Sequence, residues 1–258
     1  MPRWFGSVAE VVGYRKRQPL FLLYGDIEGL FMASSSQTTN APLVCWNCHE
    51  RTVGTHFCSS CGKVLQVLER SDYFAMFEFP RKLWIEMGAL EQKFLQLSWK
   101  LHPDNFVNAT TAEREISLKR SSELNDAYRT LHDPVARVEY LLAIEGARKE
   151  GHNKQQAPPE LLEEVFELNE SLDELREVKA TGGDTGNLKH RLETAEKNFE
   201  SKLTAVDAEL QSAAREWDSA LESGDSAKRQ LVKDKLNDLL NRRSYIRNLV
   251  VNVQKELL

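Results

Sequence analysis

The four cysteines of this chain are the residues whose spacing most directly predicts chemistry. Cys45 and Cys48 form one Cys-x-x-Cys pair, and Cys58 and Cys61 form a second pair after an interval of nine residues. Thiolates are preferred ligands of Zn²⁺, and two such pairs complete the tetrahedral site of a structural zinc ion. The spacing therefore predicts a closed site that holds one zinc ion.

Two other uses of these cysteines stay open. Two disulfides would suit a secreted chain, but no apolar signal-peptide region precedes the pairs, and no cysteine lies elsewhere in the chain. The same thiolates could instead hold iron or an iron–sulfur cluster. His49 and His56 lie between the pairs, but four thiolates already fill a tetrahedron, so we do not expect either histidine to be a ligand.

The tripeptide His102-Pro103-Asp104 is the second group that could carry chemistry. A neighbouring histidine and aspartate can act as a general acid–base pair, but such a pair needs a pocket that excludes water. Pro103 disfavours helical geometry at His102, so the tripeptide should lie in an exposed turn at the end of a helix. We therefore predict a recognition site, and we expect the chain not to be an enzyme.

Two amphipathic helices must position this tripeptide. Apolar residues three or four positions apart predict one helix before it and one after it. They are Leu90, Phe94, Leu97 and Leu101 in the first helix, and Ile116, Leu124, Ala127, Tyr128 and Leu131 in the second. Helices joined by a short loop pack antiparallel, which holds the tripeptide at the tip of a hairpin.

The C-terminal half has the periodicity of three longer helices. Apolar residues recur every three or four positions within 161–175, 188–221 and 232–257. Gly182-Gly183-Asp184 and Gly224-Asp225 separate these segments. Because each segment has one apolar face to bury, the three together predict a three-helix bundle.

Leu162 and Phe166 lie one turn apart and off the main apolar stripe of the first of these helices. Carboxylates, Glu167 and Glu170 among them, surround the pair. An apolar pair framed by acid suits a docking face for a partner with a basic rim, although a wider bundle contact could use the same pair. Tyr245 is likewise off the stripe of the last helix.

Composition limits the classes of function. Hydrophobic residues make up 41% of the 258 residues, and no run approaches the roughly 18 apolar residues that cross a bilayer. The net charge of −5 gives no support to nucleic-acid binding. No glycine-rich phosphate loop is present, so we expect no bound nucleotide.

Residues 1–42 are expected to hold a targeting segment and a flexible linker. Basic residues outnumber acidic ones in the first 24 positions, which favours a mitochondrial presequence, whereas Asp26 and Glu28 oppose that interpretation. Met32 could serve as an alternative start, which would give a cytoplasmic form as well.

Several passages resemble known proteins. The tripeptide between two amphipathic helices resembles a J-domain, the module that stimulates DnaK-type chaperone ATPases. Three further passages are similar to the HscB-type co-chaperones of iron–sulfur cluster biogenesis. They are Asp72-Tyr73-Phe74-Ala75-Met76-Phe77, Arg137-Val138-Glu139-Tyr140-Leu141-Leu142 and Glu167-Leu168-Asn169-Glu170-Ser171-Leu172. With the cysteine pairs in front, the order over roughly residues 43–258 resembles the eukaryotic members.

The resemblance implies an all-α protein with three parts. Residues 43–70 would bind zinc, residues 71–145 would form the J-domain, and residues 146–258 would bind an IscU-type scaffold through Leu162, Phe166, Glu167, Glu170 and Tyr245. In the J-domain, His102, Pro103, Asp104, Lys93 and Lys100 would stimulate ATP hydrolysis by a DnaK-type chaperone in the mitochondrial matrix. Cluster transfer from the scaffold would follow, and a homodimer stays open.

The chain departs from the family's pattern at three places. Gln96 and Trp99 thin the basic edge formed by Lys93 and Lys100, which predicts weak electrostatic steering and a dedicated chaperone partner. Glu163 stands where bacterial relatives have an apolar residue. The stretch around Gly182-Gly183 is longer than the family suggests. A general J-domain protein for unfolded clients and a zinc-ribbon nucleic-acid-binding protein are the alternatives.

Overall fold

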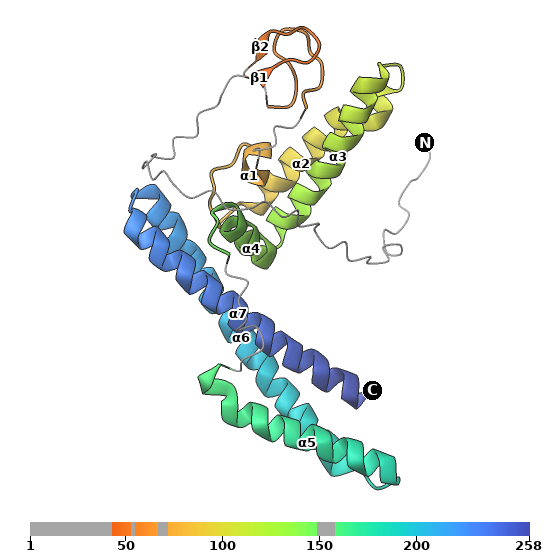
Figure 1. Cartoon of the computed structure of the whole chain (residues 1–258), viewed down its shortest axis with the longest axis vertical. Helices are drawn as coiled ribbons and strands as arrows, with labels where there is room; N and C mark the ends of the chain where they lie inside the picture. The colour runs from red at the N-terminus through yellow and green to blue at the C-terminus, as the bar shows by residue number, and fades with distance from the viewer. Residues whose placement is uncertain (1–42, 53–54, 67–71, 149–157) are drawn as a thin grey trace, which may run out of the picture. The chain divides into compact units, whose positions relative to one another are not determined.

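A computed structural model of the chain describes residues 43–52, 55–66, 72–148 and 158–258 (Figure 1). These residues are mostly helical, and their one sheet is a two-stranded hairpin. The predicted all-α class with a small N-terminal metal-binding segment is confirmed. Among the described residues, no helix is long and apolar enough to span a bilayer. The targeting segment and linker expected in residues 1–42 lie outside the described residues.

The cysteine-rich segment starts with two very short strands. Strands β1 (Leu43–Val44) and β2 (Arg51–Thr52) pair antiparallel, and a single antiparallel bridge joins Phe57 to Val64. Val64 is completely buried and belongs to the same hydrophobic core as the helices that follow. The segment is therefore packed onto the helical part of the chain through an apolar residue of its own.

A helical hairpin comes next. Its elements are α1 (Tyr73–Met76), α2 (Met87–Leu101), the 3-10 turn η1 (Pro103–Phe106) and α3 (Thr111–His132). Helix α2 begins where the Glu86 carboxylate accepts the N–H groups of Gly88 and Ala89, and it ends at His102 because Pro103 follows. Figure 1 shows α2 and α3 side by side, as predicted from their apolar stripes.

Paired contacts fix α2 and α3 as antiparallel neighbours. The Ser117 hydroxyl donates to the Leu101 carbonyl over 2.9 Å near one end of the pair. Further along, the rings of Phe94 and Tyr128 stack with centroids 4.2 Å apart. The buried face of α3 also carries Arg120, which occupies a position on the apolar stripe.

Helix α4 (Pro134–Ile144) is held in place by a buried guanidinium. Arg137 donates from Nε to the Leu131 carbonyl and from Nη1 to the Leu83 carbonyl, both over 2.6 Å. Burial lowers the pKa of Arg137, but these carbonyls still supply acceptors for the charged form. The arginine of the Arg-x-x-Tyr-Leu-Leu passage therefore joins three separate pieces of the hairpin.

The tyrosine of the same passage has an equally local task. The Tyr140 hydroxyl accepts the N–H of Tyr73 over 2.9 Å, and the two rings stack with centroids 4.4 Å apart. Burial of the Tyr140 phenol raises its pKa to about 12, so the hydroxyl stays protonated. Tyr140 thereby fixes the start of α1 against α4.

Three long helices complete the chain. After the short turn η3 (Pro159–Leu161) come α5 (Leu162–Thr181), α6 (Gly186–Glu222) and α7 (Ser226–Leu257). Helices α6 and α7 pack along their length, and α5 packs on α6. The predicted apolar stripes are buried, which confirms the bundle. Arg243, which interrupts the last stripe, pairs with Asp207 over 2.5 Å.

Helix α6 also contacts the loop between α1 and α2. The buried carboxylate of Asp218 accepts the N–H of Leu83 over 2.7 Å and the N–H of Trp84 over 2.8 Å. The indole N–H of Trp217 donates to the Arg81 carbonyl over 2.9 Å. Burial raises the pKa of Asp218, whereas the two N–H groups favour its charged form.

Candidate functional site

The four cysteine sulfurs converge on one point. The Sγ atoms of Cys45 and Cys61 lie 3.7 Å apart, as do those of Cys48 and Cys58, and all four lie within 4.8 Å of one another. A tetrahedron with Zn–S bonds of about 2.3 Å has edges of about 3.8 Å. A disulfide instead needs about 2.05 Å between its sulfurs. The cysteines are free and arranged as four ligands around one metal ion, so the disulfide alternative is not supported.

Backbone N–H groups are turned toward the thiols. The Asn47 N–H points at Cys45 Sγ and the Ser60 N–H at Cys58 Sγ, each over 3.4 Å. The N–H groups of Cys61 and Ser60 lower the pKa of Cys58 to about 6. The same arrangement, led by the Cys48 N–H, lowers the pKa of Cys45. Thiolates are the metal-binding form of cysteine, so the first cysteine of each pair is favoured in that form. The Glu50 N–H lowers the pKa of Cys48, but burial and the neighbouring thiols outweigh it and raise that pKa to about 12.

The residue after each cysteine pair has a left-handed backbone. His49 has φ of 58° and Gly62 has φ of 71°, and their N–H groups donate to the carbonyls of Cys45 and Cys58. Glycine adopts this conformation without strain, whereas histidine does so rarely. His49 therefore forms part of the turn, and the arrangement of four sulfurs does not require it as a ligand, as predicted.

The metal-binding segment is fastened to the hairpin by buried polar groups. His56 Nε2 donates to the Met76 carbonyl over 3.0 Å, and its Nδ1 accepts from Arg120 on α3. Burial, with Arg120 close by, lowers the pKa of His56 to about 4, so the ring is neutral. Lys63 pairs with the buried Glu113 of α3 over 2.6 Å.

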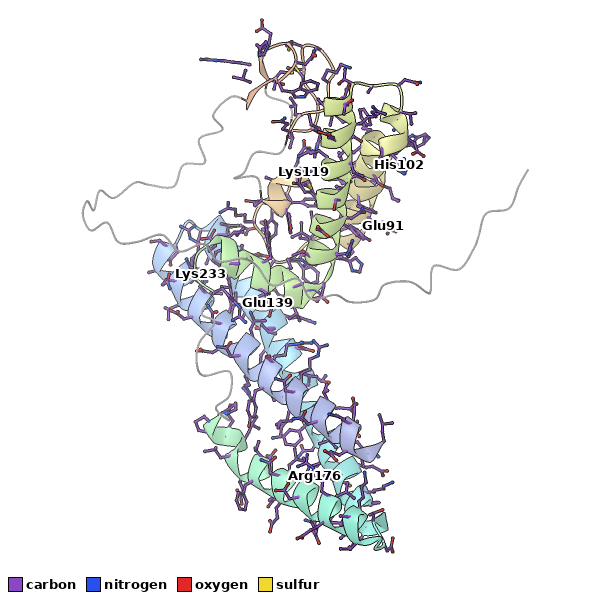
Figure 2. The ribbon with its side chains drawn as sticks, turned by 45° about the vertical axis from the view of Figure 1, so that its right-hand side comes forward. Glu91, His102, Lys119, Glu139, Arg176 and Lys233 are labelled. Atoms are coloured by element: carbon purple, nitrogen blue, oxygen red, sulfur yellow. The ribbon has the colours of Figure 1, made fainter. Side chains whose placement is uncertain are left out.

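The His-Pro-Asp tripeptide is exposed at the end of α2, where Figure 2 labels His102. The His102 Nδ1 accepts the Asp104 N–H over 3.3 Å and lies 3.5 Å from the Asp104 carboxylate. The Asn105 amide donates to the Trp99 carbonyl over 2.6 Å. These local bonds shape the loop and leave the side chains of His102 and Asp104 exposed, as expected for a recognition site.

The two lysines of the predicted basic edge differ in their surroundings. Lys93 Nζ donates to the Phe77 carbonyl over 2.6 Å, lies 3.7 Å from the Glu78 carboxylate and sits 4.8 Å from the centre of the Phe79 ring. The Lys93 ammonium group is therefore already bound by groups of this chain. Lys100 is exposed in the last turn of α2. The structure does not combine the two into one free basic edge.

The apolar pair on α5 faces solvent. Leu162 is 56% exposed and Phe166 is 71% exposed, and Glu163, Glu167 and Glu170 beside them are exposed too. The opposite face of the helix is buried, so the bundle does not need the pair. Phe166 and Glu170 line an open depression of about 910 Å³, which continues along the helix with Asn169, Asp173, Glu174, Arg176 and Glu177.

Tyr245 lies on α7 and is half-buried, with its pKa raised by burial. An ion pair of Arg242 with Glu160 over 3.4 Å joins the part of α7 around Tyr245 to the start of α5. Glu160 is two residues before Leu162, so the structure brings this part of α7 to the same end of α5. Much of Tyr245 packs against the core.

Known proteins resemble the chain over most of its length. A scan against protein-family profiles finds no match. The iron–sulfur cluster co-chaperone protein HscB of Mus musculus is 28% identical over 213 residues, which cover 80% of this chain and 79% of the mouse protein. The crystal structure of human co-chaperone protein HscB superposes with a TM-score of 0.57 at 26% identity, covering 82% of this chain and 96% of the human one. This chain is similar to HscB proteins over most of its length.

A plant relative matches a shorter stretch. The iron–sulfur cluster co-chaperone protein HscB homolog of Arabidopsis thaliana is 34% identical over 130 residues, which span half of this chain and 51% of the plant protein. The chain therefore combines a likeness to HscB proteins with a four-cysteine segment whose sulfurs suit a metal ion.

Sequence reasoning missed the residues that hold the four-cysteine segment on the helical hairpin. Arg120 carried a usable signal, because a charged residue lies four positions after Ile116 and four before Leu124 on a buried stripe. Its partner His56 carried none, since the pattern does not place residues 64 positions apart in contact. Glu113 and Lys63 are another such pair.

Proposed function

We propose that the chain is a co-chaperone of iron–sulfur cluster assembly that brings an IscU-type scaffold to a DnaK-type chaperone. The single observation that carries the proposal is the likeness to mouse HscB over 79% of that protein. The exposed tripeptide and the exposed α5 pair support it, because they offer two separate recognition surfaces.

In this proposal the loop acts on the chaperone. His102, Pro103 and Asp104 form a J-domain loop that stimulates ATP hydrolysis in the partner, with Lys100 beside it. The loop has no enclosed pocket of its own, and the side chains of His102 and Asp104 are exposed to solvent. Hydrolysis therefore occurs in the partner's active site, and this chain contributes contacts that favour the hydrolysing state of the partner.

The α5 face binds the scaffold. Phe166 and Leu162 offer exposed apolar area of a kind that marks protein interfaces, and Glu167 and Glu170 add a negative rim. The rim would favour a scaffold surface with basic residues around an apolar centre. Tyr245 extends the surface toward α7.

The metal site has a structural role in this proposal. Cys45, Cys48, Cys58 and Cys61 hold one Zn²⁺, which joins the two halves of the segment that docks on α1 and α3. Residues 1–42 direct the protein to the mitochondrial matrix. Support for that address is the excess of basic residues in the first 24 positions.

Calorimetric titration with a purified IscU-type scaffold tests the proposal. Micromolar binding is expected, and Phe166→Ala should weaken it about thirtyfold or more, as expected for a buried aromatic residue at the centre of an interface. Leu231→Ala is the matched control, because Leu231 is equally exposed, at 72%, on a different long helix, α7. Absence of binding by the unaltered chain would contradict the proposal, and binding insensitive to Phe166→Ala would move the surface away from α5.

A further inference from the structure

A second exposed apolar pair lies on α2. Leu95 is 59% exposed and Trp99 is 75% exposed, although leucine and tryptophan side chains are mostly buried in folded proteins. The face of α2 that packs on the hairpin core is supplied by other residues, Leu90 and Leu101 among them. Leu95 and Trp99 therefore contribute no core packing, and the fold does not account for them.

The pair is continuous with the His-Pro-Asp loop. Leu95, Trp99 and His102 follow one another at steps of four and three, which places them on a single stripe along the helix. The Trp99 carbonyl accepts the His102 N–H over 3.4 Å and the Asn105 amide over 2.6 Å. The loop is thus tied directly to the residue that bears the exposed indole, so a protein that touches His102 meets Trp99 next.

The stripe carries almost no charge. Gln92 and Gln96 flank Leu95, and both are exposed and neutral. Glu91 precedes Leu95 by one turn and is acidic, and Figure 2 shows Glu91 and His102 along one edge of the hairpin. Lys93 is bound to the Phe77 carbonyl. A partner that approaches this stripe therefore meets apolar area and amides, with the exposed Lys100 next to Trp99 as a single cation and no row of them.

We propose that Leu95 and Trp99 form the specificity-determining contact with the DnaK-type chaperone that the loop stimulates. This inference rests on the proposed function, because the occupant is the protein that binds His102. The matching surface expected on that chaperone is an apolar patch beside the residues that contact the tripeptide. Burial of a large aromatic side chain beside a small polar loop supplies the affinity, and the loop supplies the stimulation.

Steady-state ATPase assays test the inference, with the DnaK-type chaperone of the species that encodes this chain as the partner. The concentration of this chain that gives half-maximal stimulation and the maximal stimulation are measured separately. Trp99→Ala should raise the half-saturating concentration about thirtyfold, and Leu95→Ala about fivefold, with the maximum unchanged. Leu118→Ala on α3 is the matched control, because Leu118 is 63% exposed on the same hairpin and off the stripe.

Salt gives a second readout. Between about 50 and 300 mM NaCl the half-saturating concentration of the unaltered chain should change less than about twofold, because apolar contacts are not screened. Trp99→Arg should make that concentration strongly dependent on salt.

The outcomes separate this inference from the proposed function. If the unaltered chain stimulates and Trp99→Ala matches Leu118→Ala, the stripe is not the contact, whereas the proposed function stands. A steep salt dependence of the unaltered chain would likewise overturn the stripe. No stimulation by the unaltered chain would overturn both. Unchanged melting temperatures of the exposed-site variants exclude a folding defect as the cause of any loss.

Discussion

The two exposed apolar pairs of this chain, on α2 and on α5, have the same spacing and different surroundings. Leu95 and Trp99 are four residues apart, as are Leu162 and Phe166, and each pair lies opposite the buried face of its helix. Neutral amides flank the first pair, whereas Glu163, Glu167 and Glu170 surround the second.

The contrast concerns how each surface selects its partner. A rim of negative charge attracts a basic surface and accelerates association. This attraction weakens with added salt. An apolar stripe with neutral flanks depends on shape and on the area that is buried, and salt leaves it nearly unchanged. In the proposed function, the chain would bind its two partners through surfaces of different chemistry.

The largest expected effect is the loss of one activity while the other is retained. His102→Gln should abolish stimulation of the DnaK-type ATPase, because the exposed imidazole lies in the loop that we propose acts on the chaperone. Scaffold affinity, measured by calorimetry on the same preparation, should stay within about twofold of the unaltered chain, since α5 lies elsewhere. If both activities fall together, the two surfaces are not independent.

Loss of the metal should loosen the helical hairpin that carries the α2 pair and leave the α5 surface unchanged. Cys58→Ser removes one of four ligands, so the bound metal measured by atomic absorption should fall from about one ion per chain toward zero. The segment contacts α1 and α3 through His56, Arg120 and Lys63, so hydrogen exchange in those helices should accelerate.

Ser60→Ala is the control for the metal experiment, because Ser60 lies in the same turn and supplies only a backbone N–H to the sulfur. The cooperative thermal transition of the long helices and the affinity for the scaffold should survive Cys58→Ser. Collapse of that transition would mean that the metal-binding segment supports the whole fold.

The smallest expected effect measures the charge contrast itself. Glu170→Gln removes one exposed carboxylate from the α5 rim and should weaken scaffold binding only about two- to fivefold at low salt, because exposed charges contribute little individually. The difference between the variant and the unaltered chain should shrink at about 300 mM NaCl. Glu193→Gln, an exposed carboxylate on α6, is the control. Equal losses at both salt concentrations would contradict a charge-assisted surface.

Local patterns predicted the secondary structure well. The steps of three and four residues around Leu90 and Leu124 predicted α2 and α3, and Pro103 predicted the end of α2, because these signals act within one or two turns of helix. The four sulfurs met at one point, as the two cysteine pairs predicted. The sequence left open whether Leu162 and Phe166 face a partner or a wider bundle contact, and the structure leaves both side chains exposed.

The basic edge was the weaker prediction. Lys93 lies on the expected side stripe, yet its ammonium is bound by the Phe77 carbonyl and the Phe79 ring. Helical periodicity gives the direction of a side chain and does not give what another segment places there. The exposed Trp99, treated in the sequence as a gap in that edge, is 75% exposed, more than the other exposed hydrophobic side chain of α2, Leu95.

The sequence by itself determined the helices, the turn at Pro103 and a tetrahedral set of thiols, because each depends on residues that are close along the chain. Only the tertiary structure decided that Arg120 meets His56, that Asp218 accepts the N–H groups of Leu83 and Trp84, and that Lys93 donates to the Phe77 carbonyl. These contacts join different segments of the chain, some more than a hundred residues apart, and the buried polar groups must find partners wherever packing brings them.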